Sequence, residues 1–334
     1  MEAQKQLQLC LHTAQSIFAR LPPSVQRALL NPYVQKGLAF LVALRLVKGL
    51  SGYLSRRAQN NWLRVDRWDP NRELVVLTGG CSGIGKQIME DLSKTSVTIV
   101  VLDIKEPDFS LPPNVFFYRT DITSRPAVKQ SASQIRRSHG NPTVLINNAG
   151  VGCGGTILDK PDDKIRLTMD VNTVSHFWTV KEFLPGMIQK DHGHIITVAS
   201  LASFVGVGQI TDYSCSKAAA LAFHEGLTQE IRHWYRSKKI RTSIVHPTWI
   251  RTPLIDAILQ AGKEWKEPVL EPEQVSSAVV NQIVSGNGGQ VFVPGSTGAA
   301  SMVRGFPHWL QERIRDKASQ GFLRLRELEL AIGK

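Results

Sequence analysis

Seven short apolar runs alternate with longer stretches of mixed polarity between residues 73 and 294. The runs predict buried strands, and the stretches between them have the length of helices. Because strands that alternate with helices form a parallel sheet covered on both faces, the pattern predicts an α/β fold. The predicted strands cover residues 73–78, 97–103, 114–119, 142–147, 193–199, 240–246 and 290–294.

The first seventy residues are predicted to form helices separated by prolines. One helix precedes Pro22 and Pro23, and a short helix capped by Ser24 follows. A longer helix begins at Asn31 with Pro32 in its first turn, a position that tolerates the missing N–H of proline.

The longest of these helices contains the stretch GLAFLVALRLVKGLSGYL, which is apolar for about seven residues from Leu38 and then includes Arg45 and Lys48. It has no eighteen uncharged residues in a row, so a full membrane span is disfavoured. An in-plane or hairpin anchor fits better, since long basic side chains can reach lipid headgroups while the leucines enter the acyl boundary. The alternative is a helix that packs on the α/β unit or on a second subunit.

The first predicted strand runs directly into glycines, because residues 74–85 read LVVLTGGCSGIG. Glycine adopts backbone angles that other residues avoid, and it lets a pyrophosphate approach the free N–H groups at a helix N-terminus. Gly79, Gly83 and Gly85 are the candidates for such a dinucleotide-binding turn. A turn without a ligand is the alternative, but the preceding strand and the following helical pattern favour the dinucleotide.

Asp103 ends the second predicted strand, eighteen residues beyond Gly85 and near the spacing of about 20 expected for an acid that binds ribose. A carboxylate there accepts hydrogen bonds from the ribose hydroxyls of NAD and repels the additional phosphate of NADP. The prediction is therefore NAD(H). Lys105 lies two residues further on and would soften this preference, so NADP is not excluded.

Tyr213 and Lys217 stand four residues apart in YSCSK, thirteen residues after Ser200, which closes the apolar run HIITVAS. On a helix, positions i and i+4 share a face, so the ammonium can lie beside the phenol and, with a bound ligand, favour its ionised form. Free tyrosine has a pKa near about 10, and such a shift would make it an acid/base near neutral pH. Taken alone, the pair could equally be two neighbours on a helix surface.

An ordered series of motifs resembles the short-chain dehydrogenase/reductase family over most of residues 72–295. TGGCSGIG resembles the glycine motif of that family, and TDIT at 120–123 resembles its adenine-contacting segment. NNAG at 147–150 resembles its strand-four motif, and VNT at 171–173 resembles the segment of its catalytic asparagine. The resemblance implies a Rossmann-type doubly wound, seven-stranded parallel sheet with helical N- and C-terminal extensions.

The resemblance also implies a catalytic tetrad of Asn172, Ser200, Tyr213 and Lys217. Asn172 would hold a water in a proton relay, and Ser200 would hydrogen-bond the substrate oxygen. Tyr213 would exchange the proton, and Lys217 would also bind the nicotinamide ribose.

HPTWIRTP at 246–253 resembles the segment that flanks the nicotinamide, although Thr248 stands where the family commonly has glycine. The cofactor-binding residues that the resemblance and the spacing imply are Thr78, Gly79, Ser82, Gly83, Ile84, Gly85, Asp103, Asp121, Ile122, Asn148, Ala149, Gly150, Tyr213, Lys217, Pro247 and Thr252.

Several of these residues could also serve a purely structural role. Asn147 and Asn148 could cap a turn between strand and helix, and Asp121 could cap the next helix. Ser200 could be a turn residue at a strand end, and Asn172 a buried helix asparagine. Their joint order and spacing favour one inherited site over separate coincidences.

Length and charge divide the 334 residues into an extension at 1–70, a catalytic unit at 71–300 and a tail at 301–334. Of the net charge of +12, the extension carries +7 and the tail +3. A basic balance confined to the flanks favours an anionic lipid surface as partner. Nucleic acid is a poor partner, because the basic segments have no recognised binding motif and carry leucine where stacking aromatics would be needed.

The tail combines Trp309, Phe322 and spaced leucines with arginines, which suits a membrane surface or a partner helix. Alternatively, the charged side chains of the tail form a helix face that is exposed to solvent. Cys10, Cys81, Cys153 and Cys215 show no paired spacing and the first residues no secretory signal, so the catalytic unit is expected to face a reducing compartment. The histidines follow no ligand pattern such as HExxH, so no metal is implied.

These observations predict an oxidoreductase that transfers a hydride between NAD(H) and a lipophilic alcohol, ketone or aldehyde. Hydrophobic N-terminal extensions of this kind resemble the retinol dehydrogenase and 17-beta-hydroxysteroid dehydrogenase-like branch, which implies retinoid, steroid or long-chain substrates. They also imply the endoplasmic reticulum or lipid droplets, with the catalytic unit facing the cytosol. Residues 253–272, where the family has its substrate lid, contain Leu, Ile and Trp, which favours an apolar ligand.

The alternatives are an NADP-dependent carbonyl reductase, a catalytically silent dinucleotide-binding scaffold on lipid droplets or membranes, and a sensor of the NADH level. The intact tetrad argues against the scaffold. The resemblance allows a homodimer or tetramer, forms that the family frequently adopts, but the sequence does not reveal the oligomeric state.

Overall fold

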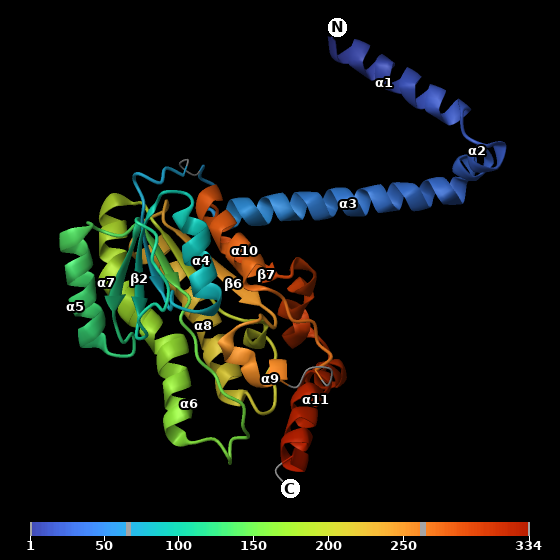
Figure 1. Ribbon diagram of the computed structural model, residues 1–334. Helices are drawn as coiled ribbons and strands as arrows, with labels where there is room; N and C mark the ends of the chain where they lie inside the picture. Colours follow the sequence, from blue (N-terminus) through green and yellow to red (C-terminus); the bar gives the residue numbers. More distant parts are fainter. Residues whose placement is uncertain (1, 65–67, 261–264, 333–334) are drawn as a thin grey trace. The chain divides into compact units, whose positions relative to one another are not determined.

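The computed structural model describes residues 2–64, 68–260 and 265–332, which form two compact units, Met1–Ala58 and Gln59–Lys334. The second unit contains the sheet (Figure 1). All seven predicted strands are confirmed, and neighbouring strands pair in parallel in the order β3-β2-β1-β4-β5-β6-β7. The strands are β1 (Leu74–Thr78), β2 (Thr98–Asp103), β3 (Val115–Arg119), β4 (Val144–Asn147), β5 (His194–Val198), β6 (Arg241–Pro247) and β7 (Gly289–Val293).

This strand order is that of a doubly wound sheet, so the predicted Rossmann-type fold is confirmed. The direction of winding reverses between β1 and β4, and in such sheets ligands bind outside the carboxyl ends of the strands at this point.

Helices cover both faces of the sheet. The helices of the second unit are α4 (Gly83–Ser93), α5 (Arg125–Ser138), α6 (Asp162–Met169), α7 (Ser175–Lys190), α8 (Thr211–Gln229), α9 (Asp256–Gln260), α10 (Pro272–Ser285) and α11 (His308–Ile332). Short helical turns link them, namely η1 (Asp170–Val174), η2 (Leu201–Ser203), η3 (Glu230–Trp234), η4 (Pro253–Ile255) and η6 (Gly295–Gly305).

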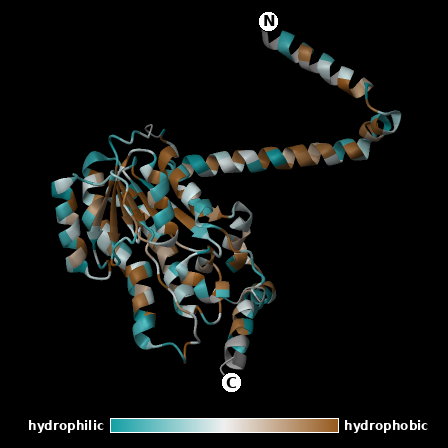
Figure 2. Ribbon diagram, viewed as in Figure 1, coloured by the Kyte–Doolittle hydropathy of each residue, from teal (hydrophilic) through white to brown (hydrophobic). Residues whose placement is uncertain are grey.

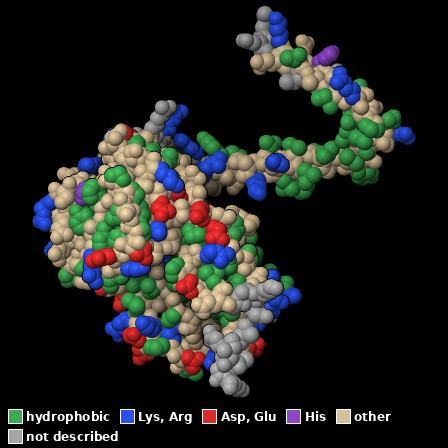
Figure 3. All heavy atoms as spheres, viewed as in Figure 1, with side chains coloured by type: hydrophobic (Ala, Val, Ile, Leu, Met, Phe, Trp, Pro, Cys, Tyr) green, Lys and Arg blue, Asp and Glu red, His purple; other side chains and the backbone are tan. Residues whose placement is uncertain are grey.

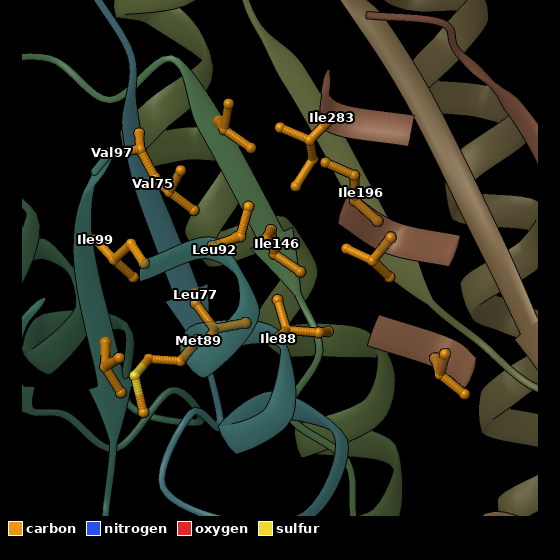
Figure 4. Packing of buried hydrophobic residues seen from close by; sticks show 14 of the residues in the cluster. Val75, Leu77, Ile88, Met89, Leu92, Val97, Ile99, Ile146, Ile196 and Ile283 are labelled. Carbon is orange, nitrogen blue, oxygen red and sulfur yellow. The ribbon is translucent and has the colours of Figure 1, made fainter. Parts of the chain in front are cut away.

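Alternate residues of each central strand enter different hydrophobic cores. Val75 and Leu77 of β1 pack with side chains of α4 and α10, among them Ile88 and Ile283 (Figure 4). Leu74 and Val76 belong to the core on the opposite face, which is filled by α5, α7 and α8. Successive strand residues point to opposite faces, so a sheet buried on both sides needs continuous apolar runs. This explains why the strands were visible in the sequence.

The first unit consists of three helices separated at prolines, as predicted. They are α1 (Glu2–Ala19), α2 (Pro23–Leu30) and α3 (Pro32–Gln59). The prediction that Ser24 caps the second helix is wrong, because Ser24 lies inside α2 and Pro22 takes the N-cap position. The side chain of Asn31 accepts a hydrogen bond from the Tyr33 amide at 2.9 Å and so caps the start of α3.

Helix α3 is long and apolar enough to cross a membrane, judged by length and composition alone. Arg45 and Lys48 therefore do not decide between a crossing helix and one that lies in the membrane plane. Phe40, Leu41 and Leu46 are exposed, and the helix carries a mostly hydrophobic surface interrupted by basic side chains (Figures 2 and 3).

Helix α11 is part of the second unit, and one side of it packs on the α/β fold. Phe322 is buried, and its ring centroid lies 5.6 Å from that of Trp249 and 5.5 Å from that of Trp265. The amide of Gly208 donates to the Ser319 hydroxyl at 3.2 Å. The tail therefore closes over the end of the sheet where the ligand is expected.

Candidate active site

One large cavity of about 910 Å³ opens at the carboxyl ends of the strands. Thr78 and Asn172 lie behind this surface. All the other predicted site residues line the cavity, namely Gly79, Ser82, Gly83, Ile84, Gly85, Asp103, Asp121, Ile122, Asn148, Ala149, Gly150, Ser200, Tyr213, Lys217, Pro247 and Thr252.

The glycines after β1 are required by backbone geometry. Gly79 has φ +68°, and a Cβ atom there would lie 2.8 Å from the Cα atom of Ala149. A Cβ atom at Gly85 would lie 1.9 Å from the carbonyl oxygen of Gly79. Helix α4 begins at Gly83, and the side chain of its N-cap, Ser82, makes no capping hydrogen bond. The turn is thus a glycine-rich cradle at a helix N-terminus, which fits a pyrophosphate.

Thr78 and Asn148 connect the glycine turn to β4. The Thr78 hydroxyl accepts hydrogen bonds from the amides of Asn148 at 3.0 Å and Ala149 at 3.1 Å. The Asn148 side-chain amide donates to the carbonyl oxygens of Thr78 and Gly79, both at 3.0 Å. Asn148 therefore joins β1 to β4 at the switch point and does not merely cap a turn. Asn147 is buried, and its side-chain oxygen accepts from Thr179 at 2.8 Å.

The Asp103 carboxylate is held by two main-chain amides, Cys81 N at 2.9 Å and Lys105 N at 3.1 Å. The ammonium of Lys105 is 3.1 Å from the Asp108 carboxylate, with which it forms an exposed ion pair. Burial, and then the Asp103 charge, raise the pKa of the Cys81 thiol to about 12, so this thiol stays protonated.

Asp121 lines the cavity. Its carboxylate accepts hydrogen bonds from the amide of Thr123 at 2.9 Å and from its hydroxyl at 2.7 Å. The N-cap of α5 is Ser124, whose hydroxyl accepts from the Ala127 amide at 3.4 Å. Asp121 therefore shapes the turn before α5 and is not the helix cap.

Tyr213, Lys217 and Ser200 converge in the structure. Tyr213 lies in the first turn of α8 and Lys217 one turn later, with its Nζ atom 5.6 Å from the phenol ring centroid. Ser200, two residues after β5, lies close enough to Tyr213 for its hydroxyl to lower the pKa of the phenol. The Lys217 ammonium donates to the Val198 carbonyl at 3.0 Å. The phenol, hydroxyl and ammonium thus surround one region of the cavity.

Burial controls the electrostatics of this group. It raises the pKa of Tyr213, while the hydrogen bond with Ser200 lowers it. Burial also lowers the pKa of the Lys217 ammonium to about 8. In the protein alone, the Tyr213 phenol is therefore harder to ionise than free tyrosine, in contrast to the expectation for the ligand-bound site.

Asn172 lies in η1, a π-helical turn, as is common at functional sites. Its side-chain oxygen accepts from the Val151 amide at 2.9 Å. Its side-chain NH₂ group donates to the Val151 carbonyl at 2.8 Å and to the Ser216 hydroxyl at 3.0 Å. Both protons of this amide are thus engaged, and Asn172 fixes the strand-four loop against α8.

Thr248, which stands at the position of the family's glycine, is accommodated by the sheet. Its amide donates to the Val293 carbonyl at 3.0 Å. Thr252, on the same segment, packs on the glycine turn, since a Cβ atom at Gly83 would lie 3.0 Å from the Thr252 methyl group.

His246 supports Ser200, and the sequence motifs gave no sign of this role. Its Nδ1 lies 3.0 Å from the Ser200 carbonyl oxygen, and its Nε2 lies 3.0 Å from the side-chain nitrogen of Gln290. Burial is the main cause that lowers the pKa of His246, to about 4. The ring is therefore neutral near pH 7, with Nδ1–H donating to Ser200 and Nε2 accepting from Gln290.

The wall of the cavity beyond Tyr213 is apolar and comes from segments far apart in the chain. Part of the predicted substrate lid, residues 253–272, lines the cavity, namely Leu254, Ile255 and Ile258. Residues 261–264 of this segment lie outside the described residues. Sequence reasoning missed the contribution of α11. The remaining apolar wall residues include Val205, Val207, Trp249, Ile314, Phe322 and Leu325.

Comparisons with known proteins bear on the family and the fold. The family model described as short chain dehydrogenase matches residues 73–262. Dehydrogenase RED2 of Cochliobolus heterostrophus is 46% identical over 207 residues, covering 61% of this chain and 78% of that protein. Estradiol 17-beta-dehydrogenase 11 of Rattus norvegicus is 32% identical over 260 residues, covering 75% of this chain and 85% of that protein. Epidermal retinol dehydrogenase 2 of Homo sapiens is 34% identical over 221 residues, covering 64% of this chain and 71% of that protein.

Among solved structures, the ligand-free aldohexose dehydrogenase of Thermoplasma acidophilum is similar, with a TM-score of 0.60 and 24% sequence identity. The match covers 68% of this chain and 94% of that one. It shows the shared fold.

Proposed function

Because the chain belongs to the short-chain dehydrogenase family and is a short-chain oxidoreductase, we propose that it is an NAD-dependent alcohol dehydrogenase or carbonyl reductase for a lipophilic substrate at a membrane surface. The observation that carries the proposal is the convergence of Tyr213, Lys217 and Ser200 beside the glycine cradle in one cavity. Such a cavity can hold a dinucleotide and a second ligand side by side.

When bound at the glycine turn of Gly79, Gly83 and Gly85, the nicotinamide cofactor would supply or accept the hydride, and the residues of the chain align the substrate and move the proton. Tyr213 exchanges the proton with the substrate oxygen, and Ser200 donates a hydrogen bond to the charge that develops there. With a ligand bound, the positive charge of Lys217 beside the phenol would favour its ionised form. His246 holds the Ser200 main chain, and Asn172 holds the loop that faces Tyr213.

The proposed cofactor is NAD(H) rather than NADP(H). The supporting observation is that Asp103 stands at the end of β2 in the cavity, with its carboxylate fixed by two amides. A fixed negative charge at the ribose disfavours an additional phosphate. The ammonium of Lys105, which would offset this, is paired with Asp108.

The proposed substrate is a retinoid, steroid or long-chain alcohol, ketone or aldehyde. The support is the apolar wall formed by η4, α9 and α11 beyond Tyr213. Apolar walls with a few convergent polar groups are typical of sites for lipophilic small molecules. Relatives named as retinol and 17-beta-estradiol dehydrogenases are consistent with this class.

The proposed location is a membrane of the endoplasmic reticulum or a lipid-droplet surface, with the catalytic unit in the cytosol. The support is α3, whose leucines are exposed and whose basic residues can reach anionic headgroups. A fusion of residues 1–70 to a fluorescent protein tests this. Membrane-bound fluorescence is expected, and a diffuse cytosolic signal would rule the anchor out.

The activity is tested by NADH production from a panel of retinol, steroids and long-chain alcohols. Turnover of at least one lipophilic alcohol is expected, with NAD preferred over NADP. A protein that binds NADH but turns over no member of the panel in either direction would be the silent scaffold instead.

A further inference from the structure

Lys160 and Asp212 form a buried ion pair beside the catalytic group, with side-chain exposures of 3% and 5%. Lys160 directly precedes the segment that leads into α6, and Asp212 is the residue before Tyr213 in α8. The Lys160 ammonium donates to the Asp212 carboxylate and, at 2.7 Å, to the main-chain carbonyl of Cys153. One buried charge thus connects α8 to the loop after β4.

That loop lies directly on the phenol. A Cβ atom at Gly152 would lie 2.9 Å from Cδ2 of Tyr213, so only a residue without a side chain fits there. Val151, at one side of this glycine, is bound through its amide and its carbonyl to Asn172. Cys153, at the other side, is bound to Lys160. The residue that covers the Tyr213 ring is therefore fastened on both sides.

Stability alone does not explain a pair of this kind. Taking two charges out of water costs several kcal/mol per ion, and a well-packed apolar pair is often as stable. The second oxygen of the Asp212 carboxylate is buried and has no hydrogen-bond partner in the described part of the chain. Neither Lys160 nor Asp212 lines the cavity, whereas Gly152, Cys153 and Tyr213 do. The pair therefore acts on the site through its neighbours.

We propose that Lys160 and Asp212 are positioning residues that hold the segment 151–153 against Tyr213 and so keep the phenol at the substrate oxygen. This inference rests on the proposed function for its effect on turnover. We call the contacts of the Lys160 ammonium with Asp212 and with the Cys153 carbonyl the clamp. The clamp is a property of the protein and can be measured without turnover.

Without the Lys160 ammonium, the Cys153 carbonyl loses its donor and Asp212 becomes a buried, unpaired carboxylate next to Tyr213. The loop would then move away from the ring, and the phenol would lose its fixed orientation. Because the glycine cradle and Asp103 are not part of this arrangement, dinucleotide binding is expected to survive.

The test is Lys160→Met in the full chain, with Lys94→Met as the matched control. Lys94 pairs with Asp91 at 2.8 Å at the end of α4, where its side chain is exposed. Hydrogen exchange in residues 151–155, where the Val151 amide donates to Asn172 at 2.9 Å, reports on the clamp, NADH fluorescence on cofactor binding, and steady-state kinetics on KM and kcat. Lys160→Met is expected to speed exchange of the Val151 amide at least tenfold, lower kcat at least tenfold and leave the NADH Kd within threefold. Lys94→Met should change none of them.

The double variant Lys160→Met, Asp212→Leu removes both charges. It replaces the single variant in the same measurements if Lys160→Met does not fold. It should also show fast exchange in residues 151–155, because the Cys153 carbonyl still lacks its donor. Lys160→Arg, which keeps the charge, should recover part of kcat.

Unchanged exchange in residues 151–155 would overturn the clamp, whatever the kinetics. Faster exchange with an unchanged kcat in an active protein would overturn the positioning role. If the wild-type protein turned over no alcohol, the proposed function would fail, and the exchange measurement would still decide on the clamp.

Discussion

A Cβ atom at Gly85 would lie 1.9 Å from the carbonyl oxygen of Gly79, which is closer than any real pair of such atoms. The two glycines therefore depend on each other: one turns the chain with a positive φ, and the other lets the first turn of α4 approach it. This contact gives the dinucleotide cradle its shape.

Gly85→Ala is expected to force this turn open and to weaken NADH binding at least tenfold, about 1.4 kcal/mol. The control is Gly226→Ala in α8, where a Cβ atom would meet nothing within 4 Å. That change should stabilise the helix by roughly 0.5–1 kcal/mol and leave binding intact. Fluorescence titration with NADH compares them, and equal affinity of the two variants would contradict the prediction.

Asp103→Ser is expected to shift the cofactor preference toward NADP at least tenfold, because the variant no longer presents a negative charge to the 2′-phosphate. Asp162→Ser, at an exposed position in the first turn of α6, is the matched control and should keep the wild-type preference. The ratio of kcat/KM for NADP and NAD measures the effect. An unchanged ratio in Asp103→Ser would show that another group selects the cofactor.

His194 makes stability depend on pH. Burial lowers the pKa of His194 to about 3, so the unfolded chain binds a proton below about 6.5 that the folded protein does not bind. Stability is therefore lost as the pH falls, by about 2 kcal/mol between pH 7 and pH 5 from this residue. In His194→Gln this part of the loss should vanish, as measured by urea unfolding at both pH values. His233→Gln, at an exposed position, should behave like the wild type.

Phe322 of α11 lines the cavity and belongs to the proposed substrate site. Phe322→Ala opens the apolar wall, and we expect KM for a long-chain alcohol to rise at least tenfold while the NADH Kd is unchanged. Leu323→Ala is the neighbouring control, because Leu323 is 55% exposed. If both variants kept the wild-type KM, the tail would not belong to the substrate site.

The strands and the glycine turn could be predicted because their signals are local. A sheet buried on both faces requires continuous apolar runs, and glycines between a strand and a helix are typical of a dinucleotide-binding turn. The cap of α2 could not be predicted in this way, because a proline at the first helical position and a serine beside it are competing signals. Pro23 starts α2 itself, which moves the N-cap from Ser24 to Pro22.

The parts of the site that escaped prediction depend on contacts between distant segments. Phe322 contacts Trp249 only in the folded chain, and nothing near either residue in the sequence indicates this. Likewise, Lys160 and Asp212 are 52 residues apart. The sequence around each of them does not distinguish it from a charged residue on the protein surface. Burial, which decides their role, is a property of the folded chain.

The central claim is that Tyr213 exchanges the proton in a site that binds the dinucleotide independently of it. Tyr213→Phe removes only the phenolic hydroxyl, and the most direct measurement compares kcat and the NADH Kd of this variant with the wild type. We expect kcat on a lipophilic alcohol to fall by about 10²–10⁴, the usual contribution of an acid/base, with the NADH Kd within threefold. Retained turnover in Tyr213→Phe would contradict the mechanism.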